Sequence, residues 1–316
     1  MDTTGTIFLP PGSSTIAGDV DALMYFLFYA SMVFFAIVVF GIIFFSLRFR
    51  HQRSPEDTPT VSISHNTKLE ILWSVIPSIL VIIVFFWGFK VYLKMHVAPK
   101  DAMEIKVTGQ KWFWSFDYPE GINTVNELVV PAGKPVKLLL SSKDVIHSFF
   151  VPDFRVKMDV LPNRYTVTWF EAPDVGTHNL FCAEFCGDKH SSMIGKVKVV
   201  SEREYKEWLV TGTSAADNVA PDKYGEKLFT SRACYTCHDI TGKNMVGPHL
   251  NGIFGKTVTL ANGKQVVVDE NYIRESILEP QAKVVAGFQP VMPTYQGILK
   301  DKDISALIAY LKTLKE

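Results

Sequence analysis

The chain has 316 residues, enough for about two soluble domains, and its 32 basic side chains balance its 32 acidic ones. A formal net charge of zero gives no electrostatic field that would favour nucleic acid or an acidic substrate, so we expect no nucleic-acid partner. Hydrophobic residues make up 47% of the chain, and they are concentrated near its N-terminus. This uneven distribution points to a membrane segment followed by soluble domains.

Two uncharged runs near the N-terminus predict a transmembrane hairpin over residues 22–94. Residues 22–47 hold no charged side chain, and at ~1.5 Å per residue a helix of this length exceeds the ~30 Å hydrocarbon core. Residues 71–89 form a second run of about the minimum spanning length. Buried core helices are one alternative. A cleaved signal peptide is another, disfavoured because Asp19 and Asp21, and no basic residue, precede the first run.

Basic residues predict the orientation of this hairpin. The tail, residues 1–21, holds no Lys or Arg. The loop between the two runs holds four: Arg48, Arg50, Arg53 and Lys68. Because cytoplasmic loops carry the excess of Lys and Arg, the loop should be cytoplasmic. Both chain ends, and everything after about Leu93, should then face the outside.

Downstream of the hairpin the pattern changes to short alternating strands. Strands are predicted at residues 104–108, 135–140, 165–170 and 196–200. Turn signals such as Pro-Ala-Gly at 131–133 separate them. Short strands at this spacing are typical of a β-sandwich or barrel, which we expect over residues 95–210.

The last part of the chain predicts a separate helical domain over residues 223–316. Residues 211–222 are small and polar with a single proline, and they predict a flexible linker. Helices are predicted at 223–231 and 271–278, and Asp301 is expected to cap a last amphipathic helix. The expected fold is thus a multi-domain membrane protein with a helical hairpin, an all-β sandwich and an all-α domain.

All four cysteines lie in two motifs, and the first motif is rich in soft ligands. Cys182 and Cys186 are followed by His190 and Met193 in one predicted loop, and His147 ends an earlier strand. Thiolate, imidazole and thioether together select copper or another soft metal, and two thiolates allow bridging of a metal pair. A disulfide would leave the other three residues unexplained, and zinc is disfavoured because methionine is a poor zinc ligand.

The second motif, Cys234-Tyr-Thr-Cys237-His238, is the attachment sequence for c-type haem. Two thiols add to the haem vinyl groups, the histidine binds the iron, and Met292 is expected as the sixth ligand. A zinc or thiol-redox site is the alternative, but no second cysteine pair and no βαβ pattern accompany the motif. Gly225 either lets the first and last helices of this domain cross closely or is an ordinary helix glycine.

The first motif, Cys-x-Glu-x-Cys-x-x-x-His-x-x-Met with an isolated upstream histidine, resembles the copper-A motif of cytochrome c oxidase subunit II. The hairpin and a cupredoxin-like sandwich agree with that family, and the C-terminal domain resembles a fused class I cytochrome c, as in caa3-type haem–copper oxidases. This resemblance implies a dinuclear copper-A ligand set: His147, Cys182, Cys186, His190, Met193 and the Glu184 carbonyl. It also implies a magnesium ligand in the Glu184 side chain. Phe149 departs from the family pattern, which often has tryptophan there.

The resemblance also assigns roles outside the ligand set. Trp112, in an aromatic run, would lie near the copper pair and receive the electron, although packing is the alternative role. Pro248 would accept a hydrogen bond from the ring of His238 and fix its orientation. Glu70 would mark the start of a proton channel into the neighbouring subunit. The alternative for Glu70 is a solvated carboxylate at a helix start.

None of the eight histidines lies inside either membrane run, so membrane haems and oxygen-binding metals would belong to another subunit. The resemblance implies an electron-transfer subunit in a bacterial cytoplasmic membrane, with both termini and both metal domains on the periplasmic side. The expected partners are an outside donor (a cytochrome c or a quinol:electron-acceptor complex), subunit I and subunit III. Electrons would pass through haem c and copper A to subunit I, which reduces oxygen to water coupled to proton translocation.

The alternatives are a copper-A nitric oxide reductase subunit and a membrane-anchored electron carrier. The linker suggests that the haem domain swings between donor and copper.

Overall fold

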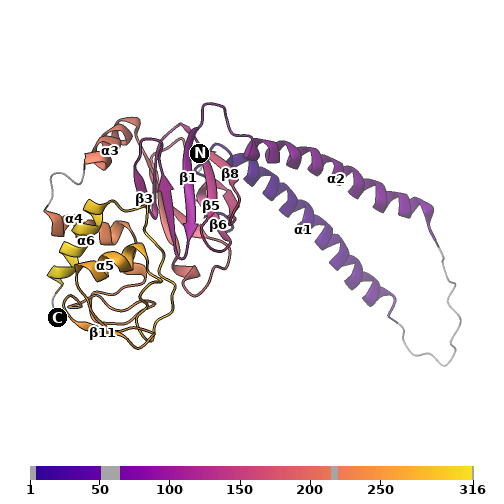
Figure 1. Ribbon diagram of the computed structural model, residues 1–316. Helices are drawn as coiled ribbons and strands as arrows, with labels where there is room; N and C mark the ends of the chain where they lie inside the picture. Colours follow the sequence, from indigo (N-terminus) through magenta and orange to yellow (C-terminus); the bar gives the residue numbers. More distant parts are fainter. Residues whose placement is uncertain (1–4, 51–64, 215–219, 315–316) are drawn as a thin grey trace, which may run out of the picture. The chain divides into compact units, whose positions relative to one another are not determined.

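The computed structural model describes residues 5–50, 65–214 and 220–314 (Figure 1). Two compact units emerge from it. One is the hairpin, Ile16–Val97. The other combines Met1–Thr15 with Ala98–Glu316, and so holds the N-terminal tail together with everything that follows the hairpin.

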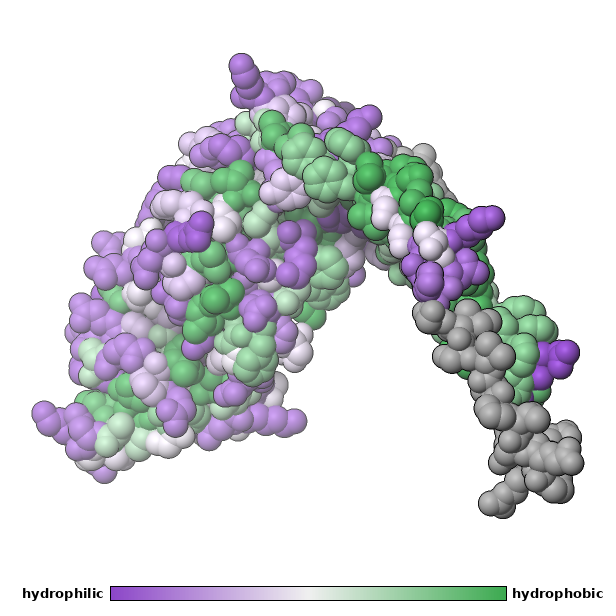
Figure 2. Space-filling view, turned by 90° about the vertical axis from the view of Figure 1, so that its right-hand side faces the viewer, coloured by the Kyte–Doolittle hydropathy of each residue, from purple (hydrophilic) through white to green (hydrophobic). Residues whose placement is uncertain are grey.

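The hairpin consists of α1 (Ala17–Arg48) and α2 (Thr67–His96), and both helices are long and apolar enough to span a membrane. Their hydrophobic surface appears in green on the right-hand side of Figure 2. Rings such as Phe40 and Phe86 stay 68% and 67% exposed, as expected of side chains that face lipid. The structure thus contains the helical hairpin that the two uncharged runs predicted.

The first helix begins earlier than the sequence predicted, so the tail is shorter than residues 1–21. Asp19 lies in the first turn of α1, where the helix dipole favours a carboxylate. It forms an ion pair with Lys94 at 2.5 Å, near the end of α2. Further along both helices, the rings of Phe26 and Trp87 lie 5.3 Å apart. These two contacts show that α1 and α2 pack antiparallel.

Two five-stranded sheets form the sandwich, as predicted. The first has the order β3 (Asn123–Val125), β2 (Phe113–Asp117), β1 (Met103–Gln110), β5 (Pro135–Ser142) and β8 (Thr166–Glu171). The second has the order β4 (Glu127–Pro131), β10 (Ile194–Val200), β9 (Gly176–Cys182), β6 (His147–Val151) and β7 (Val156–Val160). The pairs β1–β5 and β4–β10 are parallel, and the other pairs are antiparallel.

The sandwich core follows the alternation of its strands. On β5, Val136, Leu138 and Leu140 are fully buried while the residues between them are less so. On β2, Trp114 and Phe116 point into the same core. This core fixes the register of the strands whose ends carry the first cysteine motif.

A helix that the sequence analysis missed, α3 (Glu202–Ser214), follows the last strand. Its start is a capping box, because Ser201 Oγ accepts from the Glu204 amide while the Glu204 carboxylate accepts from the Ser201 amide. The ring of Trp208 lies 4.9 Å from that of Tyr118 and anchors the helix to the sandwich.

The predicted linker, residues 211–222, is therefore helical at both ends. The helix α3 continues to Ser214, and α4 begins at Pro221, where proline is favoured in the first turn. Within the expected linker, residues 215–219 lie outside the described part of the chain.

The C-terminal domain is mostly helical, with α4 (Pro221–Ser231), α5 (Glu270–Leu278) and α6 (Asp301–Thr313). It is not purely α, because a short hairpin pairs β11 (Thr257–Thr259) with β12 (Gln265–Val267). The turn between these two strands holds an Asn-Gly sequence, with Gly263 at φ +82°, and this sequence favours a tight hairpin turn. The start of α6 also differs from expectation, since Lys300 is the N-cap residue and Asp301 is the first residue of the helix, while the Asp303 carboxylate accepts from the Lys300 amide.

The close-crossing interpretation of Gly225 is confirmed. A Cβ at this position would overlap the carbonyl oxygen of Ala306 and come within 2.7 Å of Tyr310 Cβ. The two helices α4 and α6 therefore touch backbone to backbone at this point. Only glycine allows that approach.

We predict that Gly225→Ala destabilises the C-terminal domain by at least about 3 kcal/mol, because the added methyl would push two helix backbones apart. Thermal melting of the full chain in detergent, followed at the haem absorption, measures the effect. Lys227→Ala, an exposed change on the same helix, should leave the melting temperature unchanged. Equal melting of the two variants would contradict the close crossing.

Candidate metal and cofactor sites

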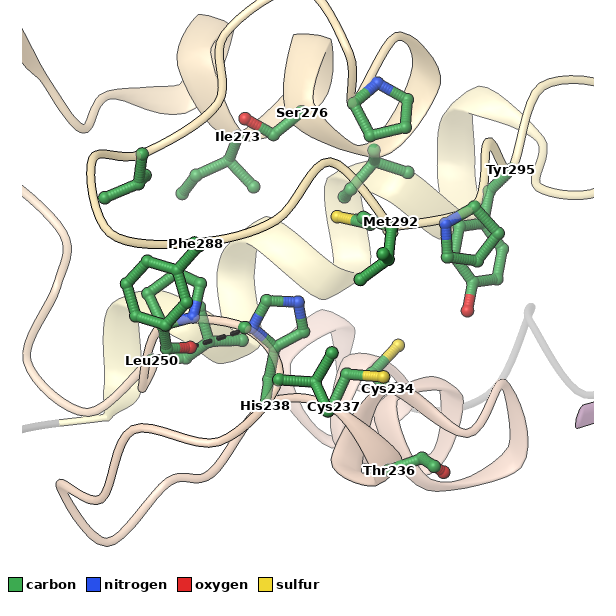
Figure 3. A pocket seen from close by; sticks show the side chains of 18 of the residues that line it. Cys234, Thr236, Cys237, His238, Leu250, Ile273, Ser276, Phe288, Met292 and Tyr295 are labelled. Carbon is green, nitrogen blue, oxygen red and sulfur yellow. Dashed lines mark hydrogen bonds between the residues drawn. The ribbon is translucent and has the colours of Figure 1, made fainter. Parts of the chain in front are cut away.

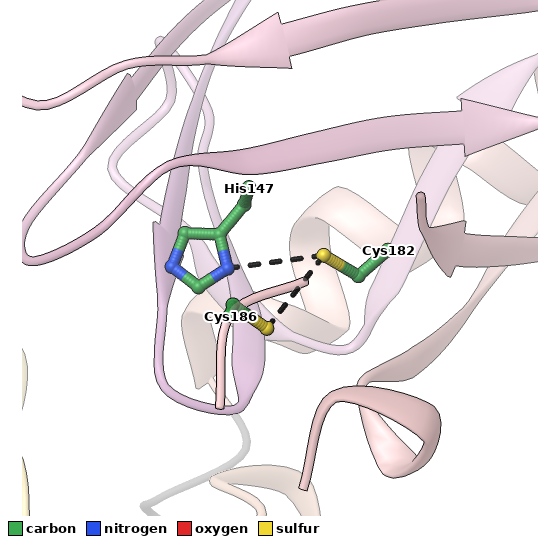
Figure 4. A group of neighbouring side chains, drawn as sticks. All are labelled: His147, Cys182 and Cys186. Atoms are coloured by element: carbon green, nitrogen blue, oxygen red, sulfur yellow. Dashed lines mark hydrogen bonds between the residues drawn. The ribbon is translucent and has the colours of Figure 1, made fainter. Parts of the chain in front are cut away.

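The first cysteine motif closes the loop between β9 and β10. Because these strands pair antiparallel up to Phe181 and Ile194, the chain must leave and return at nearly the same point. Cys182 Sγ and Cys186 Sγ come to 3.8 Å, and both side chains are buried (Figure 4). A disulfide needs sulfurs about 2.05 Å apart, so the two thiols are free, and the disulfide alternative does not describe this site.

Both predicted histidines approach these sulfurs. His147 lies on β6, which pairs with β9, and its Nδ1 is 3.8 Å from Cys182 Sγ. His190 begins a 3-10 turn in the loop, and its Nδ1 is 3.5 Å from Cys186 Sγ. Each sulfur therefore has an imidazole of its own.

Two further predicted ligands complete the cluster. Met193 is fully buried, and its Sδ lies 3.9 Å from Cys186 Sγ. The carbonyl oxygen of Glu184 lies 3.3 Å from Cys182 Sγ, while the Glu184 side chain is exposed. The structure thus brings all the predicted donors together around two adjacent thiols. This donor set, with thiolate, imidazole and thioether groups in a buried loop, fits copper.

Asp144 is a functional residue that the sequence analysis missed. Its Oδ1 lies 2.8 Å from His147 Nε2, and its Oδ2 accepts from the Lys111 amide at 2.9 Å. The ring of His147 is thereby held with Nδ1 toward Cys182. Hydrogen bonds from His147 and Lys111 outweigh burial and lower the pKa of Asp144. Its one signal in the sequence is its position three residues before a predicted ligand, and many carboxylates share such a spacing.

The two thiols differ in their acidity. Burial opposes ionisation of Cys182, but its contact with His147 brings the thiol pKa down to about 6. Burial and the neighbouring Cys182 charge raise the pKa of Cys186 to about 12. Two thiolates in one buried site repel each other, and a bound cation removes this repulsion. The pair is therefore suited to hold a metal.

Trp112 lies beside this cluster, as the resemblance implied. Its side chain is 4% exposed, and its Nε1–H donates to the Cys186 carbonyl at 3.3 Å. Phe149, at the position that departs from the family pattern, is fully buried in the core and meets Trp114 edge to face at 5.6 Å.

The second motif lines an apolar cavity in the C-terminal domain. Cys234 and Cys237 lie at one edge of it, and His238 and Met292 reach into it from opposite sides (Figure 3). Apolar side chains such as Ile273 complete the lining. An apolar slot with two thiols at its edge and two axial donors across it fits a covalently attached haem.

The ring of His238 is fixed as predicted. Its Nδ1 donates to the Pro248 carbonyl at 2.8 Å, which leaves Nε2 for a metal. Burial lowers the pKa of His238 and keeps the ring neutral, as a ligand must be. Gly247 permits this arrangement, because a Cβ there would lie 2.6 Å from the Cε1 of the ring.

Glu70 lies at the start of α2, and its contacts support the helix-start role. Its carboxylate accepts a hydrogen bond from the Asn66 amide at 3.2 Å, and the Asn66 side chain accepts from Leu69 at 3.3 Å. The proton-channel role concerns a neighbouring subunit and stays a prediction.

The fold and the two sites define the class of the protein, a membrane-anchored electron-transfer protein with a copper and a haem c site. Comparison with known families agrees. Residues 2–91 match "Cytochrome C oxidase subunit II, transmembrane domain", residues 120–200 match "Cytochrome C oxidase subunit II, periplasmic domain", and residues 223–315 match "Cytochrome c".

Relatives over most of the chain identify the family. Cytochrome c oxidase subunit 2 of Alkalihalophilus pseudofirmus is 34% identical over 90% of this chain and 84% of its own length. Cytochrome c oxidase subunit 2 of Bacillus subtilis is 30% identical over 90% of this chain and 83% of its own length. The solved periplasmic domain of subunit II from Bradyrhizobium japonicum is 33% identical over 38% of this chain and 99% of its own, with a TM-score of 0.37. The chain belongs to the cytochrome c oxidase subunit II family, and it is an electron-transfer subunit of a terminal oxidase.

We predict that Asp144→Ala lowers the affinity of the first site for copper by about 10- to 100-fold, because His147 loses the partner that orients it. Titration of copper-free full chain in detergent against a competing chelator measures this affinity. Asp174→Ala, at an exposed turn of the same sandwich, is the matched control and should bind copper normally. If Asp144→Ala bound copper as tightly as this control, the orienting role of Asp144 would be wrong.

Proposed function

We propose that this chain is subunit II of a caa3-type haem–copper oxidase and carries electrons from an extracytoplasmic donor to subunit I. The observation that carries this proposal is the presence of a buried dithiol cluster and a Cys-x-x-Cys-His cavity in one membrane-anchored chain. With haem c and copper A bound, the chain supplies one-electron transfer. Reduction of oxygen to water, coupled to proton translocation, is assigned to subunit I, and subunit III is a further partner.

At the first site, the thiolates of Cys182 and Cys186 would hold the dinuclear copper centre, which would accept and pass on one electron. The remaining donors are His147 Nδ1, His190 Nδ1, Met193 Sδ and the Glu184 carbonyl oxygen. Burial of Cys182, Cys186 and Met193 excludes water from the ligand set. The Asp144 carboxylate holds the His147 ring in place, so the donor atoms keep their positions when the charge of the site changes.

At the second site, Cys234 and Cys237 would hold haem c through two thioether bonds. His238 Nε2 and Met292 Sδ would bind the haem iron, and a methionine ligand would raise its reduction potential. The Pro248 carbonyl keeps the His238 ring oriented. This hydrogen bond occupies Nδ1 of the imidazole and leaves Nε2 free to bind the iron.

Trp112 is proposed as the residue through which electrons reach the first site. The residue lines the haem cavity, and its indole nitrogen donates to the carbonyl of Cys186, one of the two thiolate residues. A ring in this position shortens the gap that an electron must cross. A packing role alone would not require contact with both sites.

The orientation with both metal domains on the periplasmic side of a bacterial cytoplasmic membrane is also proposed. The tail is hydrogen-bonded to the sandwich, from Ser13 N to the Asp153 carbonyl and from Thr15 N to the Glu171 carbonyl. This supports a tail and a sandwich on one side of the membrane, and we propose that the basic loop lies on the other. The positive-inside rule supports the cytoplasm for that loop.

The exposed carboxylate of Glu184 is proposed as a magnesium ligand at the contact with subunit I. It stands in the copper loop, so a divalent ion there would touch both subunits. The donor is proposed to be a cytochrome c or a quinol:electron-acceptor complex.

Purification of the tagged chain in mild detergent tests the proposed function. We expect a stable complex with a many-helix protein that holds haem and copper, and oxygen uptake with a reduced donor. Recovery of the chain alone would indicate a free electron carrier. A partner without copper at its active site would point to nitric oxide reductase, and either result would overturn the proposal.

We predict that Glu70→Ala slows oxygen reduction about tenfold or more without changing either metal spectrum, because the proton channel loses its first carboxylate. Glu70→Gln separates the two roles, since an amide oxygen still accepts from the Asn66 amide but cannot carry a proton. Both variants should be slow when turnover is measured in the complex. Normal turnover of Glu70→Gln would leave Glu70 with its helix-start role only.

A further inference from the structure

The N-terminal tail presents two adjacent large apolar side chains to solvent. Ile7 is 93% exposed and Phe8 is 62% exposed. Neighbouring apolar side chains that a folded chain leaves at its surface are typical of a contact with a membrane or a partner. Residues 5–18 hold no charged side chain, so this segment can enter an apolar environment without removing a charge from water.

The two side chains stand at the tip of an ordered loop. The Thr6 amide donates to the Leu9 carbonyl at 2.7 Å, and Thr6 Oγ1 accepts from the Leu9 amide at 3.1 Å. A Cβ on Gly5 would lie 3.0 Å from the Leu9 carbonyl oxygen, so the loop is tightly closed. Ile7 and Phe8 lie between the two bonded residues. We call residues 6–9 the tail tip.

The tail tip is held on the sandwich by the residues that follow it. Besides the two backbone hydrogen bonds of Ser13 and Thr15, the hydroxyl of Ser14 donates to the Phe154 carbonyl at 2.8 Å, and Ser14 is only 1% exposed. The guanidinium of Arg155 donates to the carbonyl of Pro10 at 2.7 Å. Pro10 directly follows the tail tip, so the tip has a defined place on the sandwich.

The end of the sandwich that holds the tail is the end nearest the membrane. Thr15 bonds to Glu171, the last residue of β8, and the hairpin begins directly after Thr15. The chain that returns from the hairpin enters the first sheet at Met103, the first residue of β1. The register places Glu171 opposite the first residue of β5 and Met103 opposite the second. Both connections to the hairpin therefore meet the same end of this sheet.

A second exposed apolar side chain lies at this end. Val175, which is 62% exposed, stands in the turn that follows Glu171 and leads into β9. Tyr165 is similarly exposed, at 68%, but it precedes β8 and so lies at the opposite end of the sheet. At ~3.3 Å per residue, the length of β8 separates it from Glu171 by about 20 Å.

We propose that the tail tip inserts into the lipid leaflet next to the sandwich, with the turn at Val175 as a second contact on the same surface. The ligand is the acyl-chain region just below the lipid headgroups. Uncharged apolar side chains beside a membrane helix suit this environment, because burying them in lipid removes apolar surface from water. The inserted tip adds a point of attachment to the two chain connections and so limits the tilt of the sandwich over the bilayer.

Photo-cross-linking to lipid tests the insertion. The full chain, with both cofactors bound, is placed in phosphatidylcholine vesicles in which some acyl chains carry a diazirine. After illumination, cleavage before Asp19 releases the tail, and mass spectrometry locates the adducts. We expect adducts on the tail tip at least about fivefold more often than on Tyr165, because only the tip reaches the acyl chains. Equal labelling of the tail tip and Tyr165 would overturn the proposal.

A double variant, Ile7→Ser with Phe8→Ser, tests whether the apolar side chains cause the insertion. Carbenes insert into O–H bonds more readily than into C–H bonds, so serines that stayed among the acyl chains would gain adducts. We expect several-fold fewer adducts on the tail tip instead. Tyr165→Ser, which also removes an exposed ring, is the matched control and should leave the labelling of the tip unchanged. Undiminished labelling in the double variant would contradict the insertion.

The same labelling of the purified complex in vesicles separates lipid from a protein partner. We expect the adducts on the tail tip to persist when the neighbouring subunits are present. Their loss in the complex would assign the tip to a protein contact and overturn the proposal. The inference goes beyond the proposed function and does not rest on it, because the assay follows lipid contact and would give the same result for a free electron carrier.

Discussion

The constraint on which the rest of the structure depends is the approach of two free thiols, Cys182 and Cys186, to 3.8 Å in a buried loop. Two like charges at this distance are unfavourable in a protein interior unless a cation lies between them. The antiparallel return from β9 to β10 forces the approach, and the sandwich core fixes those strands. The fold therefore holds the two thiols close together.

From these thiols, contacts lead outward in two directions. Through His147 and Asp144 they reach the amide of Lys111, and through the carbonyl of Cys186 they reach Trp112. Both routes end in the segment that helps to wall the haem cavity. Lys111 and Trp112 therefore connect the surroundings of the two thiols with the wall of this cavity.

The proximity of the predicted donors could be expected from the sequence because they are local or fall on neighbouring strands. Cys182 to Met193 lie in one loop, and His147 ends a strand that a sandwich brings alongside. Asp144 was missed because a carboxylate near a ligand has no distinctive spacing. The helix α3 was missed although Ser201 and Glu204 form a capping box.

The contact between the two domains could not have been predicted in this way. An outward-facing ring such as Phe113 gives no sign of its partner, and Tyr295 comes from a distant part of the chain. Only the folded structure shows that their rings stack. The linker composition suggested a haem domain that swings between donor and copper, and this stays a prediction.

Electron paramagnetic resonance of the copper-loaded full chain tests the central claim most directly, because it reports on the metal that the two thiols share. We predict two copper ions per chain and a mixed-valence signal in which one unpaired electron is spread over both nuclei. Cys186→Ser, which removes one bridging sulfur, should abolish that signal. A signal from a single isolated copper ion in the unaltered chain would contradict the account.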